Sequence, residues 1–167
     1  MILARAPVEV APGVWTTGEV SRRSFETVMD LGKSKLVKVE GGTEGSDMIP
    51  DDQSLLLREK GVGLVVVTGC AHSGLLNILS HVESLTGERV RAMIGGTHLT
   101  GRSSEYISAT VDGLRRFDLQ ILSPCHCTGF NAMAELSRAF PASFELNYSG
   151  KTLQPGKLLR EREKSRL

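Results

Sequence analysis

An apolar run followed by a short turn of small residues recurs three times along the chain. The apolar runs occupy residues 64–67, 90–94 and 119–122. Apolar residues at helical spacing follow each turn, over residues 75–82, 107–114 and 133–140. This pattern predicts a β-α-β-α-β-α series, in which buried strands alternate with amphipathic helices.

A β-hairpin is predicted just before this series. Residues 53–58 and 64–67 are joined by residues 59–63, a loop of hairpin length that contains glycine. The second of these strands is continuously apolar, as expected of a strand covered on both faces. The predicted fold class is therefore α/β, with a mixed sheet covered by helices.

The patterns near the two ends of the chain are weaker. Residues 1–50 are rich in glycine and proline and have only short apolar runs, at 8–10 and 35–39, so we expect loops and one or two short strands there. Residues 144–148 and 150–153 are expected to form a final pair of short strands.

Composition agrees with one globular domain. The chain has 167 residues, 40% of them hydrophobic, and a formal net charge of +1. We assign residues 1–153 to the domain and residues 154–167 to a tail. The tail alternates in charge sign, which favours a solvated terminal helix or a frayed end over a nucleic-acid-binding arm. The near-neutral charge argues against nucleic-acid and membrane-surface partners.

No secretion signal or membrane span is evident in the sequence. No run approaches the roughly 18 consecutive apolar residues that a span requires. The three cysteines are an odd number, and two of them are separated by one residue, so a disulfide scaffold is not expected. We expect a soluble, cytoplasmic protein with reduced thiols.

Each of the three turns ends in a histidine. His72, His98 and His126 are spaced by 26 and then 28 positions (98 − 72 and 126 − 98), about one strand-helix unit each time. The loops after parallel strands gather at one edge of a sheet, so these imidazoles are expected to be neighbours. Three imidazoles at one edge suit Zn²⁺ or a similar metal. His81 lies inside a predicted helix and is left out of the site.

The remaining polar residues of these turns leave several roles open. Cys70, Cys125 and Cys127 can bind the metal as thiolates, but packing beside the ligands is the favoured interpretation. Asp51 and Asp52 can cap the hairpin, contact a histidine or act as turn residues, and turn chemistry is favoured. A weaker possibility is contact with an anionic substrate by the charged group Glu19, Arg22, Arg23 and Glu26. A nucleotide-binding module has little support, because no Gly-x-Gly-x-x-Gly motif is present.

Four motifs in a fixed order carry a family resemblance: DDQ at 51–53, TGCAHSG at 68–74, IGGTHL at 94–99 and PCHCTG at 124–129. Together they resemble the dihydropterin-ribofuranosylaminobenzene phosphate synthase-like branch of the metallo-β-lactamase superfamily. The resemblance implies the C-terminal half of an αβ/βα sandwich, without the His-x-His-x-Asp-His loop that supplies most metal ligands in that family.

The resemblance also implies site residues. His72 and His126 match metal ligands of the family, and His98 falls near the position of a bridging aspartate. Roles next to the metal or the substrate would fall to Asp52, Cys70, Cys125, Cys127, Thr128 and Gly129. The implied cofactor is Zn²⁺, or Mn or Fe, as one or two ions once the missing half is supplied.

Two functions follow from this combination. The first is a metal-dependent hydrolase, in which metal-activated water attacks a phosphoryl or carbonyl centre of a small-molecule substrate. The substrate can be one with a phosphate group. The site of this hydrolase would be completed by self-association or by a complementing N-terminal half. The alternative is a non-catalytic fragment or interaction module that retains the fold without the histidine-rich loop.

Overall fold

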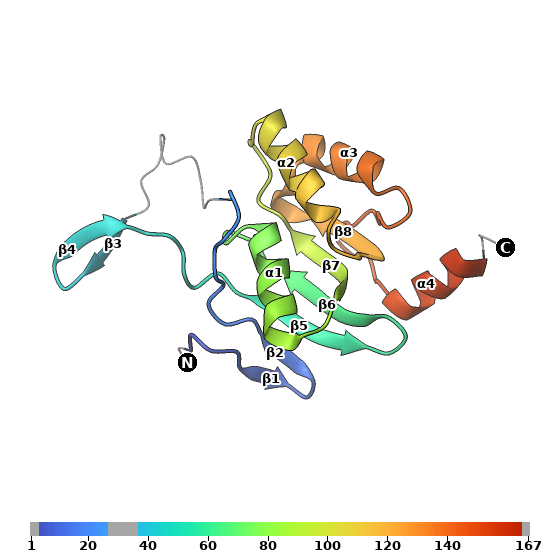
Figure 1. The fold of residues 1–167 in the computed structure, drawn as a ribbon, viewed down its shortest axis with the longest axis horizontal. Coiled ribbons are helices and arrows are strands. Elements are labelled where there is room, and N and C mark those ends of the chain that lie inside the picture. Colours follow the sequence, from blue (N-terminus) through green and yellow to red (C-terminus); the bar gives the residue numbers. More distant parts are fainter. Residues whose placement is uncertain (1–3, 27–36, 165–167) are drawn as a thin grey trace.

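A six-stranded mixed sheet forms the centre of the protein (Figure 1). The structure is a computed structural model that describes residues 4–26 and 37–164. The strand order is β1-β2-β5-β6-β7-β8, and β3 and β4 form a separate two-stranded sheet. The strands are β1 (Glu9–Ala11), β2 (Val14–Thr16), β3 (Val37–Glu40), β4 (Thr43–Ser46), β5 (Ser54–Glu59), β6 (Gly63–Thr68), β7 (Val90–Gly96) and β8 (Ile121–Cys125).

The predicted hairpin and the three strand-helix units are confirmed. Strands β5 and β6 pair antiparallel, whereas β6, β7 and β8 pair parallel. The helices are α1 (Leu75–Thr86), α2 (Ser104–Leu114), α3 (Phe130–Ala139) and α4 (Pro155–Lys164), with a 3₁₀ turn, η1, at His126–Thr128. Within the described part of the chain, none of the helices is long and apolar enough to span a membrane.

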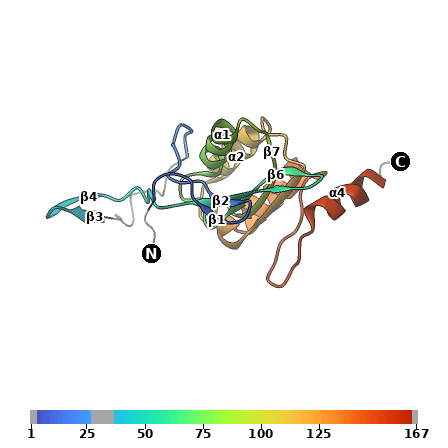
Figure 2. The same ribbon diagram turned by 90° about the horizontal axis from the view of Figure 1, so that it is seen from below.

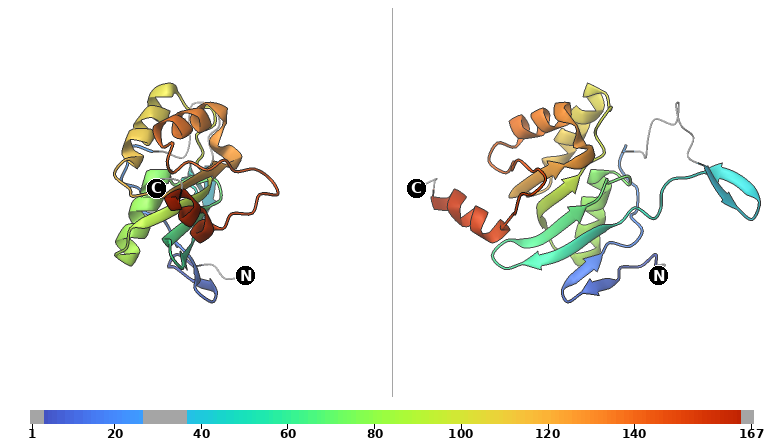
Figure 3. Two further views of the ribbon diagram at one scale, coloured as in Figure 1. Left: turned by 90° about the vertical axis from the view of Figure 1, so that its right-hand side faces the viewer. Right: turned by 180° about the vertical axis from the view of Figure 1, so that it is seen from behind.

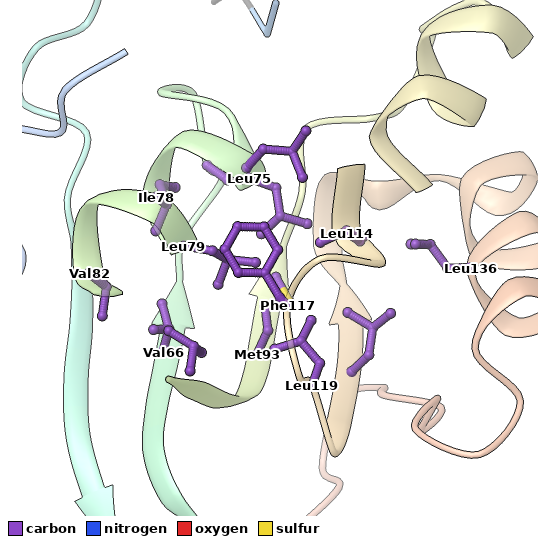
Figure 4. Packing of buried hydrophobic residues seen from close by; sticks show 14 of the residues in the cluster. Val66, Leu75, Ile78, Leu79, Val82, Met93, Leu114, Phe117, Leu119 and Leu136 are labelled. Atoms are coloured by element: carbon purple, nitrogen blue, oxygen red, sulfur yellow. The ribbon is translucent and has the colours of Figure 1, made fainter. Parts of the chain in front are cut away.

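The main hydrophobic core lies between α1, α2, α3 and one face of the sheet (Figure 4). Strand residues Val66, Met93 and Leu122 point into it and are fully buried. Helix α1 buries Leu75 and Leu79 against them, because residues four apart share one face of a helix. This core fixes the three strand ends, and hence the loops that follow them, relative to one another.

The opposite face of the sheet carries a second, smaller cluster. Alternate strand residues Val65, Ala92 and Ile121 belong to it, and Leu158 and Leu159 of α4 pack against it. Figure 2 shows α1 and α2 on one side of the sheet, whereas α4 lies at one end of the molecule. The expected terminal helix of the tail therefore forms and contributes apolar contacts.

Polar contacts also hold α4 in place. The Arg162 guanidinium donates hydrogen bonds to the carbonyl oxygens of Gln120, at 2.8 Å, and of Phe144, at 3.1 Å. It also bonds to the Glu145 carboxylate at 3.1 Å. Helix α4 is thus attached to the segment after α3, and the rear view of Figure 3 shows it beside the turn of the β5–β6 hairpin.

Two expectations at the ends of the chain are wrong. The described part of the first 50 residues contains four short strands instead of one or two, because tight turns at Gly13 and at residues 41–42 give each run a hairpin partner. Residues 35 and 36 of the second predicted run lie outside the described residues. The expected strand pair at 144–148 and 150–153 does not form. Only Phe144 forms a β-bridge to the sheet, at Leu122, and Asn147 contacts β8 through its side chain, whose Nδ2 donates to the carbonyl oxygen of Ser123 at 3.3 Å.

Candidate metal centre

Strands β6, β7 and β8 deliver three histidines to one edge of the sheet, as the sequence pattern predicts. His72 follows β6, His98 follows β7, and His126 is the first residue after β8. The rings of His72 and His98 lie edge to face, with centroids 4.6 Å apart. His126 is linked to the loop of His72 through Cys70, whose Sγ lies 3.2 Å from His126 Nε2.

A buried carboxylate orients this group. Asp52 Oδ1 lies 3.9 Å from His72 Nδ1, and its other oxygen accepts a hydrogen bond of 2.9 Å from the backbone N–H of Ser73. The Asp52 side chain is only 7% exposed. Of the roles left open for it, the structure therefore supports contact with a histidine, whereas Asp51 is an exposed turn residue.

Two of the three cysteines lie between the histidines. Cys127 Sγ accepts a hydrogen bond of 3.2 Å from the backbone N–H of His98 and lies 3.4 Å from the carbonyl oxygen of Cys70. Burial raises the pKa of the Cys70 thiol, and the nearby Cys127 raises it further. Burial also raises the pKa of Cys125, which lies apart from the other two and lines a cavity.

The backbone at the site adopts the left-handed region at residues other than glycine. Ala71 has φ of 60°, and His98 and His126 each have φ of 52°. Such conformations cost on the order of 1–3 kcal/mol each and cluster at functional sites, where the surrounding structure maintains them. Gly95 and Gly129 of the same turns also have positive φ, of 126° and 77°.

Thr128 and Gly129 shape the loop that carries His126. The buried Thr128 hydroxyl donates to the carbonyl oxygen of Cys125 at 2.7 Å and accepts from the Thr97 hydroxyl at 3.0 Å. Gly129 has φ of 77° and precedes the first turn of α3. These contacts join the turns after β7 and β8 and so fix the direction of His126.

An open cavity of about 640 Å³ adjoins His126. Its aromatic walls, Phe130 and Tyr148, are 87% and 62% exposed. The full lining is Cys125, His126, Thr128, Gly129, Phe130, Met133, Asn147, Tyr148 and Ser149. Phe130 and Tyr148 were not predicted as site residues, although Phe130 directly follows the last histidine motif.

The charged group considered for anion binding does not act as a unit. Arg22 donates to the carbonyl oxygen of Ile49 at 3.0 Å and to the Ser73 hydroxyl at 3.4 Å, next to the His72 loop. Glu26 is buried beside the N-terminus of α1, where its carboxylate accepts a hydrogen bond from the backbone N–H of Leu76.

The other members of the group, and His81, lie away from the histidines. Glu19 pairs with Arg5 across 3.6 Å. Arg23 uses its backbone N–H, which donates to Asn77 Oδ1 at 2.7 Å. His81 contacts the carbonyl oxygen of Thr17 at 3.1 Å, in keeping with its placement inside a helix.

The donor set at this edge fits a transition metal. Imidazole nitrogens suit Zn²⁺, Fe²⁺ and Mn²⁺, and a carboxylate that faces the second ring nitrogen of a ligand histidine is the usual supporting contact. Asp52 lies on the Nδ1 side of His72, the His98 ring lies against the His72 ring, and His126 is linked to the His72 loop through Cys70. The residues present therefore offer donor atoms of the kind that a transition metal binds.

Known proteins resemble the chain over most of its length. No protein-family model matches it. It is 32% identical over 158 residues to 7,8-dihydropterin-6-methyl-4-(β-D-ribofuranosyl)-aminobenzene-5'-phosphate synthase of Methanocaldococcus jannaschii, covering 92% of this chain and 52% of that protein. It is also 35% identical over 100 residues to an uncharacterised protein of the same organism, covering 60% of this chain and 36% of that protein.

A solved structure shares the fold. The crystal structure of a metal-dependent hydrolase of the β-lactamase superfamily matches with a TM-score of 0.74 and 29% identity, over 92% of this chain and 57% of that chain. The chain thus spans about half the length of the synthase and of this hydrolase. The chain is therefore similar in sequence to a dihydropterin-ribofuranosylaminobenzene phosphate synthase and shares the fold of a metal-dependent hydrolase of the β-lactamase superfamily.

Proposed function

We propose that the chain contributes the metal centre of a hydrolase that acts on a small molecule with a phosphoryl or carbonyl group. The observation that carries this proposal is the convergence of His72, His98 and His126 at the carboxyl ends of three adjacent parallel strands, with Asp52 facing His72. Ligands of α/β proteins bind at such edges. The similarity to a metal-dependent hydrolase supports the same conclusion.

The chain's own residues would hold and orient the metal. Asp52, fixed by the backbone N–H of Ser73, restrains His72 through the Nδ1 side of its ring. The left-handed turns direct His98 and His126 from the neighbouring strands. A bound Zn²⁺, Mn²⁺ or Fe²⁺ ion would supply Lewis acidity that activates water and polarises the substrate oxygen.

The cavity beside His126 is the proposed substrate site. Phe130 and Tyr148 offer exposed aromatic surface for a flat ring, and Asn147 supplies a polar group between them. The first turn of α3 also opens here, and its N-cap residue Gly129 provides no side-chain hydrogen bond. A helix N-terminus attracts anions, which favours a phosphorylated substrate.

The second face of the sheet is the proposed docking surface for the layer that completes the site. Leu55, Leu57, Val67 and Ile94 share this face by strand register, and Leu158 and Leu159 of α4 pack against the cluster around Val65. An apolar sheet face requires a covering layer. We propose that a second copy of the chain, or a complementing half with histidine ligands, supplies it.

The proposed hydrolase activity is tested by elemental analysis of the purified chain and by assays with p-nitrophenyl phosphate esters and p-nitrophenyl acetate. The purified chain, supplied with Zn²⁺ or Mn²⁺, should bind metal stoichiometrically and hydrolyse one of these esters. His72→Ala and His126→Ala should each lower metal affinity and turnover by at least about tenfold, because each removes an imidazole donor.

His81→Gln is the matched control, since His81 lies on α1 away from the three strand ends. Its metal content and turnover should equal those of the wild type. Absence of both metal and turnover in the wild-type chain, alone and with a complementing half, would instead favour the non-catalytic interaction module.

A second candidate is synthesis rather than hydrolysis. The 32% identity to a named synthase favours it. Mass spectrometry of reaction mixtures can detect the dihydropterin-ribofuranosylaminobenzene phosphate that the name of the relative specifies. Formation of this product without ester hydrolysis would establish the synthase and exclude the hydrolase.

A further inference from the structure

We propose that Cys70, His126 and Cys127 form a thiolate-containing site for Zn²⁺ or another thiophilic cation. The two sulfur atoms and one imidazole nitrogen of these residues all lie within 4.8 Å of one another. The proposal goes beyond the hydrolytic function, because it names a ligand set that binds an ion whether or not hydrolysis follows. It shares only His126 with the proposed histidine centre.

The spacing of the three donor atoms suits one tetrahedral ion. Zinc–sulfur bonds of about 2.3 Å and zinc–nitrogen bonds of about 2.0 Å place neighbouring S and N ligands roughly 3.5 Å apart. Cys70 Sγ and His126 Nε2 are 3.2 Å apart. This pair is therefore within a few tenths of an ångström of the separation that a shared zinc ion requires, and the third donor atom, Cys127 Sγ, lies within 4.8 Å of both.

The fold brings Cys127 to Cys70 across the intervening strand. Cys70 follows β6 and Cys127 follows β8, and β7 lies between these strands. A side chain at Gly96, the last residue of β7, would place its Cβ 2.9 Å from Cys127 Sγ and 2.2 Å from the carbonyl oxygen of Gly69. The bare backbone of Gly96 thus leaves the space that the sulfur occupies.

Backbone contacts fix the position of the Cys127 sulfur. The backbone N–H of His98 donates to Cys127 Sγ at 3.2 Å, and the same sulfur lies 3.4 Å from the carbonyl oxygen of Cys70. His126, with its left-handed φ of 52°, reaches Cys70 from the other strand end. The backbone of all three turns is therefore arranged around the same two sulfur atoms.

The ligand chemistry determines which ions the site would take. Two thiolates and one imidazole select Zn²⁺ and similar ions, and not Mg²⁺ or Ca²⁺, which prefer oxygen ligands. His126 is exposed, so a fourth position remains open to water or a substrate, as in catalytic rather than structural zinc sites. Cys125 lies outside the cluster and lines the cavity, so it is not a ligand.

Titration with Co²⁺ under reducing conditions tests the proposal. Thiolate ligation gives a near-ultraviolet sulfur-to-cobalt charge-transfer band, which nitrogen and oxygen ligands do not. The metal-free chain should develop this band at one equivalent of Co²⁺ and lose it when Zn²⁺ is added. Cys70→Ser and Cys127→Ser should each weaken the band and lower the affinity about tenfold or more, and the double variant should abolish the band.

Cys125→Ser is the matched control and should leave band and affinity unchanged. Circular dichroism and thermal unfolding check that each variant is folded. His72→Ala separates this site from the hydrolase, because it should retain the band even where turnover is lost. Bound Co²⁺ without a charge-transfer band, or a band that survives in the double cysteine variant, would overturn the proposal.

Discussion

Gly96 controls how closely the loops of the candidate centre approach one another. Its backbone N–H donates to the carbonyl oxygen of Gly69 at 3.0 Å, and a Cβ there would meet that oxygen at 2.2 Å. Gly96→Ala should therefore lower the free energy of unfolding by about 1–3 kcal/mol, since it overpacks a site bounded by backbone. Urea denaturation of the two proteins measures this difference.

Gly69 provides the matched control at the same edge of the sheet. A Cβ built on Gly69 has no neighbour within 4 Å, and its φ is not positive. Gly69→Ala should change stability by no more than about 0.5 kcal/mol. Equal losses in the two variants would show that the close approach at Gly96 has no special role.

The positions of the histidines were predictable at this scale, but their backbone conformations were not. The repeat of apolar run, small-residue turn and histidine places His72, His98 and His126 at equivalent strand ends. A left-handed φ at His98 and His126 depends on contacts such as Cys127 Sγ with the His98 N–H, which join distant segments. Sequence spacing contains no information on such contacts.

At the scale of elements, apolar periodicity predicts the helices and strands that are stabilised by contacts between residues near in sequence. The strand-helix units and the antiparallel hairpin have strong apolar periodicity, and all of them form. Residues 144–148 alternate between apolar and polar side chains, but they bridge to β8 only at Phe144, and Leu146 and Tyr148 remain exposed. Edge pairing therefore depends on tertiary context rather than on pattern.

The N-terminus of α1 shows another contact that sequence reasoning missed. Its N-cap residue is Gly74, which has no side chain to offer. Instead Glu26, about fifty positions earlier, accepts the backbone N–H groups of Leu76 at 2.7 Å and Asn77 at 3.3 Å. Local capping rules do not detect a cap supplied from so far away.

The buried position of Glu26 makes this cap dependent on pH. Burial raises the pKa of Glu26 above 4.5, although hydrogen bonds from Ser24 and the α1 backbone partly oppose the shift. Protonated Glu26 is therefore favoured in the folded protein. The stability that it contributes is fully present below the pKa of Glu26 in the unfolded chain and is lost as pH rises through its pKa in the folded protein. Glu26→Gln keeps an acceptor oxygen without the charge, so its stability relative to wild type should increase from acid to neutral pH.

Thermal or urea unfolding of both proteins across this pH range provides the measurement. Glu88→Gln is the control of opposite sign, because the hydrogen bond from Arg58 lowers the pKa of Glu88. Its stability relative to wild type should therefore decrease, slightly, over the same range. A stability difference for Glu26→Gln that does not vary with pH would contradict the assigned effect of burial.

At the scale of the whole molecule, the two faces of the sheet are unequally covered. Helices α1, α2 and α3 bury one face, whereas the other has a small cluster and the contacts of α4. The family resemblance predicts half of a two-sheet sandwich, and the relatives are about twice as long. No sequence pattern within this chain identifies a layer that would cover the second face.

The proposed docking of a second copy on this face gives the last prediction. Leu55 of β5 is 38% exposed and pairs in register with Val67, so a substitution there disturbs the core little. In an interface, however, Leu55→Lys would bury an unpaired ammonium group at a cost of several kcal/mol, and each ~1.4 kcal/mol raises the dissociation constant tenfold. Light scattering should show a dimer or larger assembly for the wild type and a monomer for Leu55→Lys. Leu85→Lys, at an exposed position on α1, should still assemble. A wild-type chain that remains monomeric at high concentration would exclude self-association and leave the complementing half as the proposed partner.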